Sequence, residues 1–214
     1  MAAQHAMNID AWGYYQRATL HLQEYTKEGN RLAREYALKA IEIDSDYALA
    51  YVPLATSHYR DLRSGKAEDE DYAEEEIFKA ARKAIELDNM SAESHYAMGL
   101  AYQIAGQYDL AVAELSRSLE LNPYNTWVRF ALGGSLHFLG KPKDAVVELE
   151  KAVALNPNDG RLFALISLLA RAHLNAENYE EAVSWGRRAI NIRADAVEAH
   201  FIVTSALGHL GRID

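Results

Sequence analysis

The chain contains no cysteine among its 214 residues, which excludes disulfide bonds and thiol chemistry. This absence is compatible with a reducing compartment, and we expect a cytoplasmic protein. Proline is also scarce, and its four residues lie mostly where helices are expected to end. Long helical segments are therefore possible over most of the chain.

Long apolar runs and an excess of positive charge are absent as well. Without a run of 18 apolar residues, no membrane insertion is expected. The first residues lack a charged region followed by an apolar core, so no secretory signal is predicted. Residues 1–7 are expected to be disordered or vector-derived. The net charge of −9 argues against direct binding of nucleic acid, which requires a basic surface.

The familiar catalytic and cofactor motifs are also missing. The sequence has no Walker loop, no Rossmann glycine fingerprint, no GxSxG and no HExxH. The histidines His95 and His200 occupy one repeat position, and His58 and His173 occupy another, so they are expected to be stacked rather than to converge on a metal. We therefore expect no catalytic residues, no metal site and no cofactor, and an enzyme remains only a weak alternative.

The sequence does contain an internal repeat. Residues 92–123 and 126–157 are two copies of one unit, and both copies end in Leu-Asn-Pro. Pro123 and Pro157 are 34 residues apart, and Gly99, Gly106 and Ala111 recur at the same interval. A fixed period of this size is typical of stacked repeat proteins.

The unit resembles the tetratricopeptide repeat (TPR), a helix-turn-helix. The matching residues are Gly99, Gly133, Tyr102, Ala111, Ala145, Pro123 and Pro157. The resemblance implies an all-α, right-handed superhelical solenoid of about 11 antiparallel helices, in five pairs plus a terminal half repeat. Gly99 and Gly133 are expected to face the neighbouring helix, where a small residue lets two helices approach.

One repeat array is expected over residues 8–214. Its approximate repeats are 8–45, 46–90, 92–123, 126–157 and 163–194, followed by a half repeat at 197–214. The register breaks twice. Ser45 and Asn89 are 44 residues apart, so ten extra residues must lie in the loop after Leu62 or extend one of the two helices beside it. The second break is an excess of three further residues, which fits best at 158–162.

In the TPR family, exposed positions of each first helix line the inner face of the superhelix. Carrying these positions over predicts an unusually aromatic groove, and the same carry-over places Ser167 and Glu198 on it. The candidate partner-binding residues are Tyr59, Tyr96, Gln103, Trp127, Phe130, His137, Phe138, Arg171 and Phe201. Aromatic anchors favour capture of a peptide or helix. The alternative is that Tyr96 and Phe130 only fill the space between helices.

Some family members clamp a C-terminal carboxylate with basic residues on these positions. Here the clamp positions carry Val52, Thr56, Tyr96, Leu100, Phe130 and Gly134. None of them is basic, so no carboxylate clamp of that kind is expected.

The resemblance implies a non-enzymatic scaffold that binds a protein or peptide. Residues 26–55 also look like the repeat arrays of some bacterial multidomain regulators, namely class III adenylate cyclase-like proteins and winged-helix transcriptional regulators. This likeness implies a regulatory module of a larger bacterial protein. The alternative is a structural module that forms homo-oligomers through its exposed terminal helix.

Overall fold

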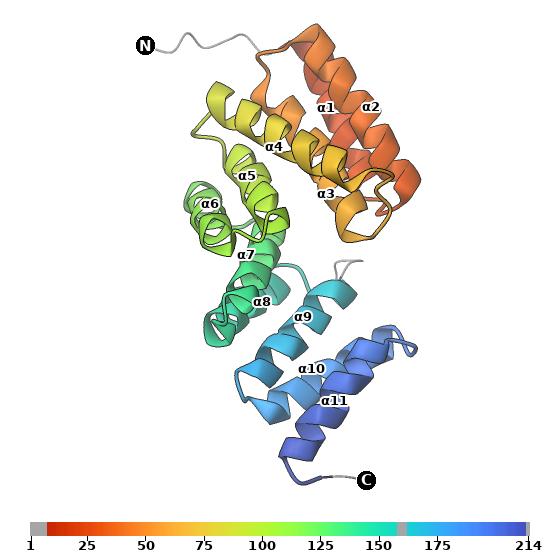
Figure 1. Ribbon diagram of the computed structural model, residues 1–214, viewed down its shortest axis with the longest axis vertical. Helices are drawn as coiled ribbons and strands as arrows, with labels where there is room; N and C mark the ends of the chain where they lie inside the picture. Colours follow the sequence, from red (N-terminus) through yellow and green to blue (C-terminus); the bar gives the residue numbers. More distant parts are fainter. Residues whose placement is uncertain (1–7, 158–161, 213–214) are drawn as a thin grey trace. The chain divides into compact units, whose positions relative to one another are not determined.

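The computed structural model describes residues 8–157 and 162–212, and these residues form 11 helices and no strand (Figure 1). The expected all-α repeat fold is confirmed, with five antiparallel helix pairs followed by a single helix. The helices are α1 (Ile9–Leu22), α2 (Lys27–Ile43), α3 (Ala48–Arg63), α4 (Glu70–Leu87), α5 (Ala92–Ile104), α6 (Tyr108–Leu121), α7 (Thr126–Phe138), α8 (Pro142–Leu155), α9 (Leu162–Asn175), α10 (Tyr179–Ile192) and α11 (Val197–His209).

The helices belong to two compact units. Met1–Leu121 is the N-terminal unit, with α1 to α6, and Asn122–Asp214 is the C-terminal unit, with α7 to α11. Within each unit, every helix packs against the next helix along the chain. The boundary between the units falls after Leu121, within the Leu-Asn-Pro that ends the first copy of the 34-residue repeat.

Small residues allow the close approach of paired helices, as predicted. A Cβ atom added at Gly99 would lie 2.6 Å from Leu115 Cγ, and one at Gly133 would lie 2.6 Å from Leu149 Cγ. Both leucines are fully buried. Each glycine therefore forms the floor of a socket that the leucine of the partner helix fills, and any larger residue would overpack it.

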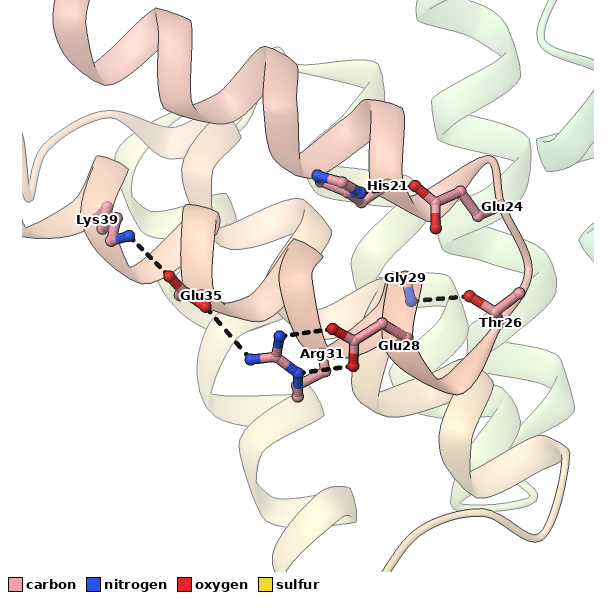
Figure 2. Close-up of polar contacts among 8 residues, drawn as sticks. All are labelled: His21, Glu24, Thr26, Glu28, Gly29, Arg31, Glu35 and Lys39. Carbon is pink, nitrogen blue, oxygen red and sulfur yellow. Dashed lines mark hydrogen bonds and ion pairs between the residues drawn. The ribbon is translucent and has the colours of Figure 1, made fainter.

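The junction between α1 and α2 shows how the sequence defines a helix start (Figure 2). Thr26 is the N-cap of α2, and its hydroxyl accepts a hydrogen bond of 2.8 Å from the amide of Gly29. Gly29 lies so close to the end of α1 that an added Cβ would be 2.6 Å from the carbonyl oxygen of His21. Along the exposed face of α2, Arg31 bridges Glu28 and Glu35. A threonine cap and a glycine contact thus fix where the second helix begins.

The ten extra residues of the second repeat are divided among three places rather than confined to the loop or to one of the two helices beside it. Helix α3 has 16 residues where α5 has 13, and α4 has 18 where α6 has 14. The connection between α3 and α4 spans residues 64–69, whereas the one between α5 and α6 spans only 105–107. Both helices and the connection therefore take up the insertion.

Two sequence-based expectations concern residues outside the described part of the chain. The three-residue excess expected at 158–162 falls on residues 158–161, apart from Leu162, which begins α9. The expectation for residues 1–7 lies outside it as well.

Candidate partner-binding surface

The histidines at equivalent repeat positions contact the backbone. His95 Nε2 donates to the carbonyl of Asn89 at 2.9 Å, and His200 Nε2 donates to the carbonyl of Ala194 at 2.8 Å. Arg129 occupies the same position in the repeat that follows that of His95, and it donates to the carbonyl of Pro123 at 2.7 Å. Each side chain thus ties its helix to the preceding loop. Over the described residues, no group of three histidines or acids is placed to hold a metal ion.

Three candidate residues lie in the N-terminal unit. The hydroxyl of Tyr59 on α3 donates to Gln103 Oε1 on α5 at 2.8 Å, and burial raises the pKa of Tyr59. Tyr96, also on α5, is half-buried. The structure therefore brings Tyr59 and Gln103 together, and their main polar groups satisfy each other.

Two tyrosines near this set are not among the candidate residues predicted from the sequence. The rings of Tyr15 on α1 and Tyr47 before α3 meet edge to face at 5.7 Å. Burial raises the pKa of Tyr15 to about 12, with smaller contributions from the Glu93 carboxylate and from Tyr47. Tyr15 lies on α1 at the spacing of core residues, so the sequence offers no signal that separates packing from partner binding.

The remaining six candidates lie in the C-terminal unit, and four of them are on α7. Trp127 and Phe130 meet edge to face at 5.7 Å, and His137 and Phe138 do so at 5.6 Å. Half of the Phe138 surface is exposed, at 50 %. These pairs supply rigid apolar surface at both ends of one helix.

The other two candidates, on α9 and α11, add charge and a further aromatic ring. Arg171 on α9 forms an ion pair with Glu198 on α11, which holds the two helices together at this surface. Phe201 is one turn beyond Glu198 and is 69 % exposed. An apolar ring this open is an unusual feature of a surface that already carries three other aromatic residues.

Four buried polar atoms on α7 and α9 have no hydrogen-bond partner among the described residues, namely Arg129 Nε, His137 Nδ1, Ser167 Oγ and His173 Nε2. Two of them, His137 Nδ1 and Ser167 Oγ, belong to predicted groove positions. Ser167 precedes Arg171 by one helical turn, so both lie on the same face of α9. Burial, followed by the nearby Arg171 cation, lowers the pKa of His137 and keeps its ring neutral. A neutral imidazole nitrogen and a hydroxyl can each donate to or accept from a ligand.

We call this set the α7/α9/α11 surface. It comprises Trp127, Phe130, His137, Phe138, Ser167, Arg171, Glu198 and Phe201. It combines exposed aromatic rings, one charged pair and unsatisfied polar atoms, which is the composition of a site that accepts a polar backbone with apolar side chains.

The positions of the carboxylate clamp do not form an anion site. Val52, Thr56, Leu100 and Gly134 are buried and neutral. None of them supplies a positive charge for a carboxylate.

Comparison with known proteins places this geometry in a class. Residues 102–168 match the family model described as tetratricopeptide repeat. A search of curated proteins finds no match. The described fold is that of TPR solenoid proteins, since solved TPR structures are similar to it over most of the chain.

Three solved structures illustrate the likeness. The chain is 24 % identical to YrrB, described as "a TPR protein with an unusual peptide-binding site", with a TM-score of 0.63 over 83 % of this chain and 85 % of that one. It is 20 % identical to pilF of Pseudomonas aeruginosa, with a TM-score of 0.68 over 95 % and 86 %. It is 22 % identical to the first TPR of Spaghetti (RPAP3), bound to an HSP90 peptide, with a TM-score of 0.53 over 58 % and 96 %. At these identities the likeness shows the fold.

Among residues 8–157 and 162–212, no helix combines the length and apolar character needed to span a bilayer.

Proposed function

We propose that the protein is a non-enzymatic interaction scaffold that binds a peptide or helix of a protein partner on the α7/α9/α11 surface. The observation that carries this proposal is the pair of buried, unpaired polar atoms, His137 Nδ1 and Ser167 Oγ, among exposed aromatic side chains. A buried polar group without a partner costs about 1–3 kcal/mol. A ligand that supplies the missing hydrogen bonds recovers that cost on binding.

A peptide fits these requirements better than a compact apolar ligand. Its backbone amides and carbonyls can pair with Ser167 and His137, while its apolar side chains pack on Phe138 and Phe201. Energetic hot spots of interfaces are enriched in aromatic and arginine residues, and this surface carries both kinds. The Arg171–Glu198 pair adds a polar rim that favours one orientation of the chain.

The N-terminal candidates Tyr59, Tyr96 and Gln103 take a secondary place in this proposal. Because Tyr59 and Gln103 already satisfy each other, a ligand there would first have to break their hydrogen bond. The solved structures described by their bound or binding peptides, YrrB and Spaghetti, support a peptide ligand for this fold. No C-terminal carboxylate anchor is proposed, because the clamp positions are neutral.

We further propose that this scaffold is a cytoplasmic regulatory module of a larger bacterial protein. The support is the likeness of residues 26–55 to the arrays of bacterial multidomain regulators. Expression of the gene at its native length, followed by mass determination, tests this point. A native product that ends with the repeats and carries no other domain would contradict it.

Selection of peptides from a phage-displayed library on the whole chain tests the binding function. Phe201→Ala is expected to weaken the selected peptides about tenfold, which corresponds to about 1.4 kcal/mol. Ser167→Ala is expected to weaken them while raising the melting temperature, because it removes an unsatisfied buried hydroxyl. A purely structural serine would not produce these opposite effects.

Tyr72→Ala is the matched control, since it removes an exposed aromatic side chain from α4. It is expected to leave peptide affinity unchanged. The proposal fails if no peptide is enriched, or if Phe201→Ala and Tyr72→Ala have the same effect.

A structural homo-oligomerisation module is the second candidate, and α11 favours it. Val197 is 81 % exposed and Phe201, one turn later, is 69 % exposed, so both present an apolar stripe. Light scattering of the wild type and of Val197→Lys tests this candidate. A dimer that dissolves in Val197→Lys, with no peptide selected, would replace the peptide proposal.

A further inference from the structure

An apolar groove lies in the N-terminal unit. It shares no helix with the α7/α9/α11 surface. Helices α2 and α4 both pack on α3, yet their backbones make no close contact with each other. The space between them is a groove of about 1050 Å³. Its floor is Tyr51 and Leu54 of α3, and apolar side chains of α2 and α4 form its walls. We call it the α2/α4 groove.

The walls of the groove expose apolar surface that no described helix covers. Leu38 of α2 is 54 % exposed, and Ile41 follows it on the same face of the helix. On α4, Phe78 lines the opposite wall and is held edge-on by Tyr102 at 5.9 Å. The hydroxyl of Tyr51 donates to the carbonyl of Ser45 at 2.9 Å, which fixes the floor. The groove is therefore formed by side chains that are already held in place.

The charge along the groove is net negative, with five acidic and three basic residues in its lining. Lys79 pairs with Glu76 and Lys83 pairs with Glu86, whereas Arg82 keeps its positive charge over the Phe78 ring at 5.2 Å.

Three acidic residues remain at the end of the groove where α4 begins. They are Asp71, Glu74 and Glu75, and none of them forms an ion pair with a described residue. Asp71 lies in the first turn by which α4 exceeds α6, so the insertion itself supplies part of this charge. The uncompensated charge of the groove is negative.

We infer that the α2/α4 groove binds an amphipathic helix of a protein partner, with an apolar stripe on one face and lysine or arginine beside it. Grooves between helices accept such a helix through apolar side chains at three- and four-residue spacing. Leu38, Ile41 and Leu54 provide the apolar contact, and the acids of α4 provide charge complementarity that orients the helix. The inference is independent of the peptide surface in the C-terminal unit.

The test uses the whole chain and a defined probe. The probe is a fluorescein-labelled peptide of about 14 residues, or four helical turns, with leucine on one face and lysine elsewhere. Fluorescence anisotropy is expected to show saturable binding that weakens about tenfold or more in Asp71→Lys/Glu75→Lys. Leu38→Ser is expected to weaken it several-fold with little change in its salt dependence, because it removes an apolar contact from the rim.

Asp109→Lys/Asp144→Lys is the matched control. It places the same charge change on acids in the first turns of α6 and α8, neither of which lines the groove. This variant is expected to bind the probe as the wild type does. A peptide of the same pattern with glutamate in place of lysine is expected not to bind.

Several outcomes would overturn the inference. Equal weakening by the two charge-reversal variants would show attraction to the acidic chain in general. Amide chemical-shift changes confined to α7, α9 and α11 would place the probe on the other surface. A wild-type dimer that dissolves in Leu38→Ser would assign the groove to a second copy of the chain, and absence of saturable binding would reject it outright.

Discussion

The α3–α4 and α5–α6 hairpins are built on one pattern but differ in length and in how they pack. In the shorter hairpin, Gly99 on α5 receives Leu115 from α6. In the longer hairpin, Ala55 and Ala81 occupy the equivalent positions, and both are fully buried. The same contact between two helices is thus made in two ways. In the short hairpin a leucine fills the space left by a glycine, and in the long hairpin two small alanines meet.

The extra length of the longer hairpin is organised by polar groups. Asp61 is 4 % exposed, and its carboxylate accepts from Asn30 and from Arg34, both at 2.7 Å. Its backbone carbonyl accepts from the amides of Lys66 and Ala67. One aspartate therefore fastens the connection 64–69 to both α3 and α2. The same elements enclose a pocket of about 750 Å³. The comparison shows that an insertion in a repeat protein can be ordered by a buried carboxylate rather than by additional apolar contact.

The largest loss of stability is expected at the Gly99–Leu115 contact of the short hairpin, where a larger side chain does not fit. Gly99→Leu should lower the free energy of unfolding by about 3 kcal/mol, because the new side chain occupies the space of Leu115. Urea denaturation followed by circular dichroism measures the change. Gly208→Ala is the control, since an added Cβ there meets nothing within 4 Å, and it should stabilise slightly. Equal stability of Gly99→Leu and wild type would contradict the socket.

A smaller effect is expected in the long hairpin, where the free energy of unfolding should depend on pH through His58. Burial, together with Arg34, lowers the pKa of His58 to about 4, although Glu76 and Asp61 oppose the shift. In the unfolded chain the ring titrates near its ordinary value of about 6.5. Between these two values only the unfolded chain binds the proton, so stability is complete above pH 6.5 and declines as the pH falls toward 4.

The expected loss from His58 between pH 7 and pH 4.5 is about 1.5 kcal/mol, after allowance for solvent screening. His58→Leu introduces the residue type found at the equivalent position of α7, Leu136, and should remove this part of the pH dependence. Urea midpoints of both proteins across the range measure it. Parallel pH profiles for the two proteins would contradict the prediction.

The smallest effect concerns the turn that closes each hairpin. Gly106 ends the α5–α6 turn with a φ of 68°, and Glu177 takes the corresponding place after α9 with a φ of 65°. A side chain is unfavourable in this left-handed region. Glu177→Gly should therefore stabilise the C-terminal unit by about 0.7 kcal/mol, and Gly106→Ala should destabilise by a similar amount. Thermal melts should shift in opposite directions for the two variants.

The repeat pattern could be predicted from the sequence because it depends on short-range periodicity. The 34-residue spacing indicated the helix pairs, and the glycines of that pattern indicated the sockets at Leu115 and Leu149. The Asn8 and Thr26 caps are local as well, since capping depends on neighbours within one turn. These features needed no knowledge of distant contacts.

Other features depend on contacts between residues far apart in the chain. The division of the ten extra residues follows from Asp61 pairing with Asn30 and Arg34, some 30 residues earlier, which no local pattern specifies. For the same reason the sequence did not reveal that Tyr59 and Gln103 satisfy each other. The assignment of the candidate residues to partner binding stays a prediction.

The anchored connection 64–69 has a practical consequence for spectroscopy. Since the chain has no cysteine, Ser64→Cys would create its single thiol, on an exposed residue between two well-defined helices. A maleimide dye attached there would report on the Asp61-fastened segment alone, without a background signal. The insertion that interrupts the repeat thus offers a labelling position that the regular hairpins, with their three-residue turns, do not provide.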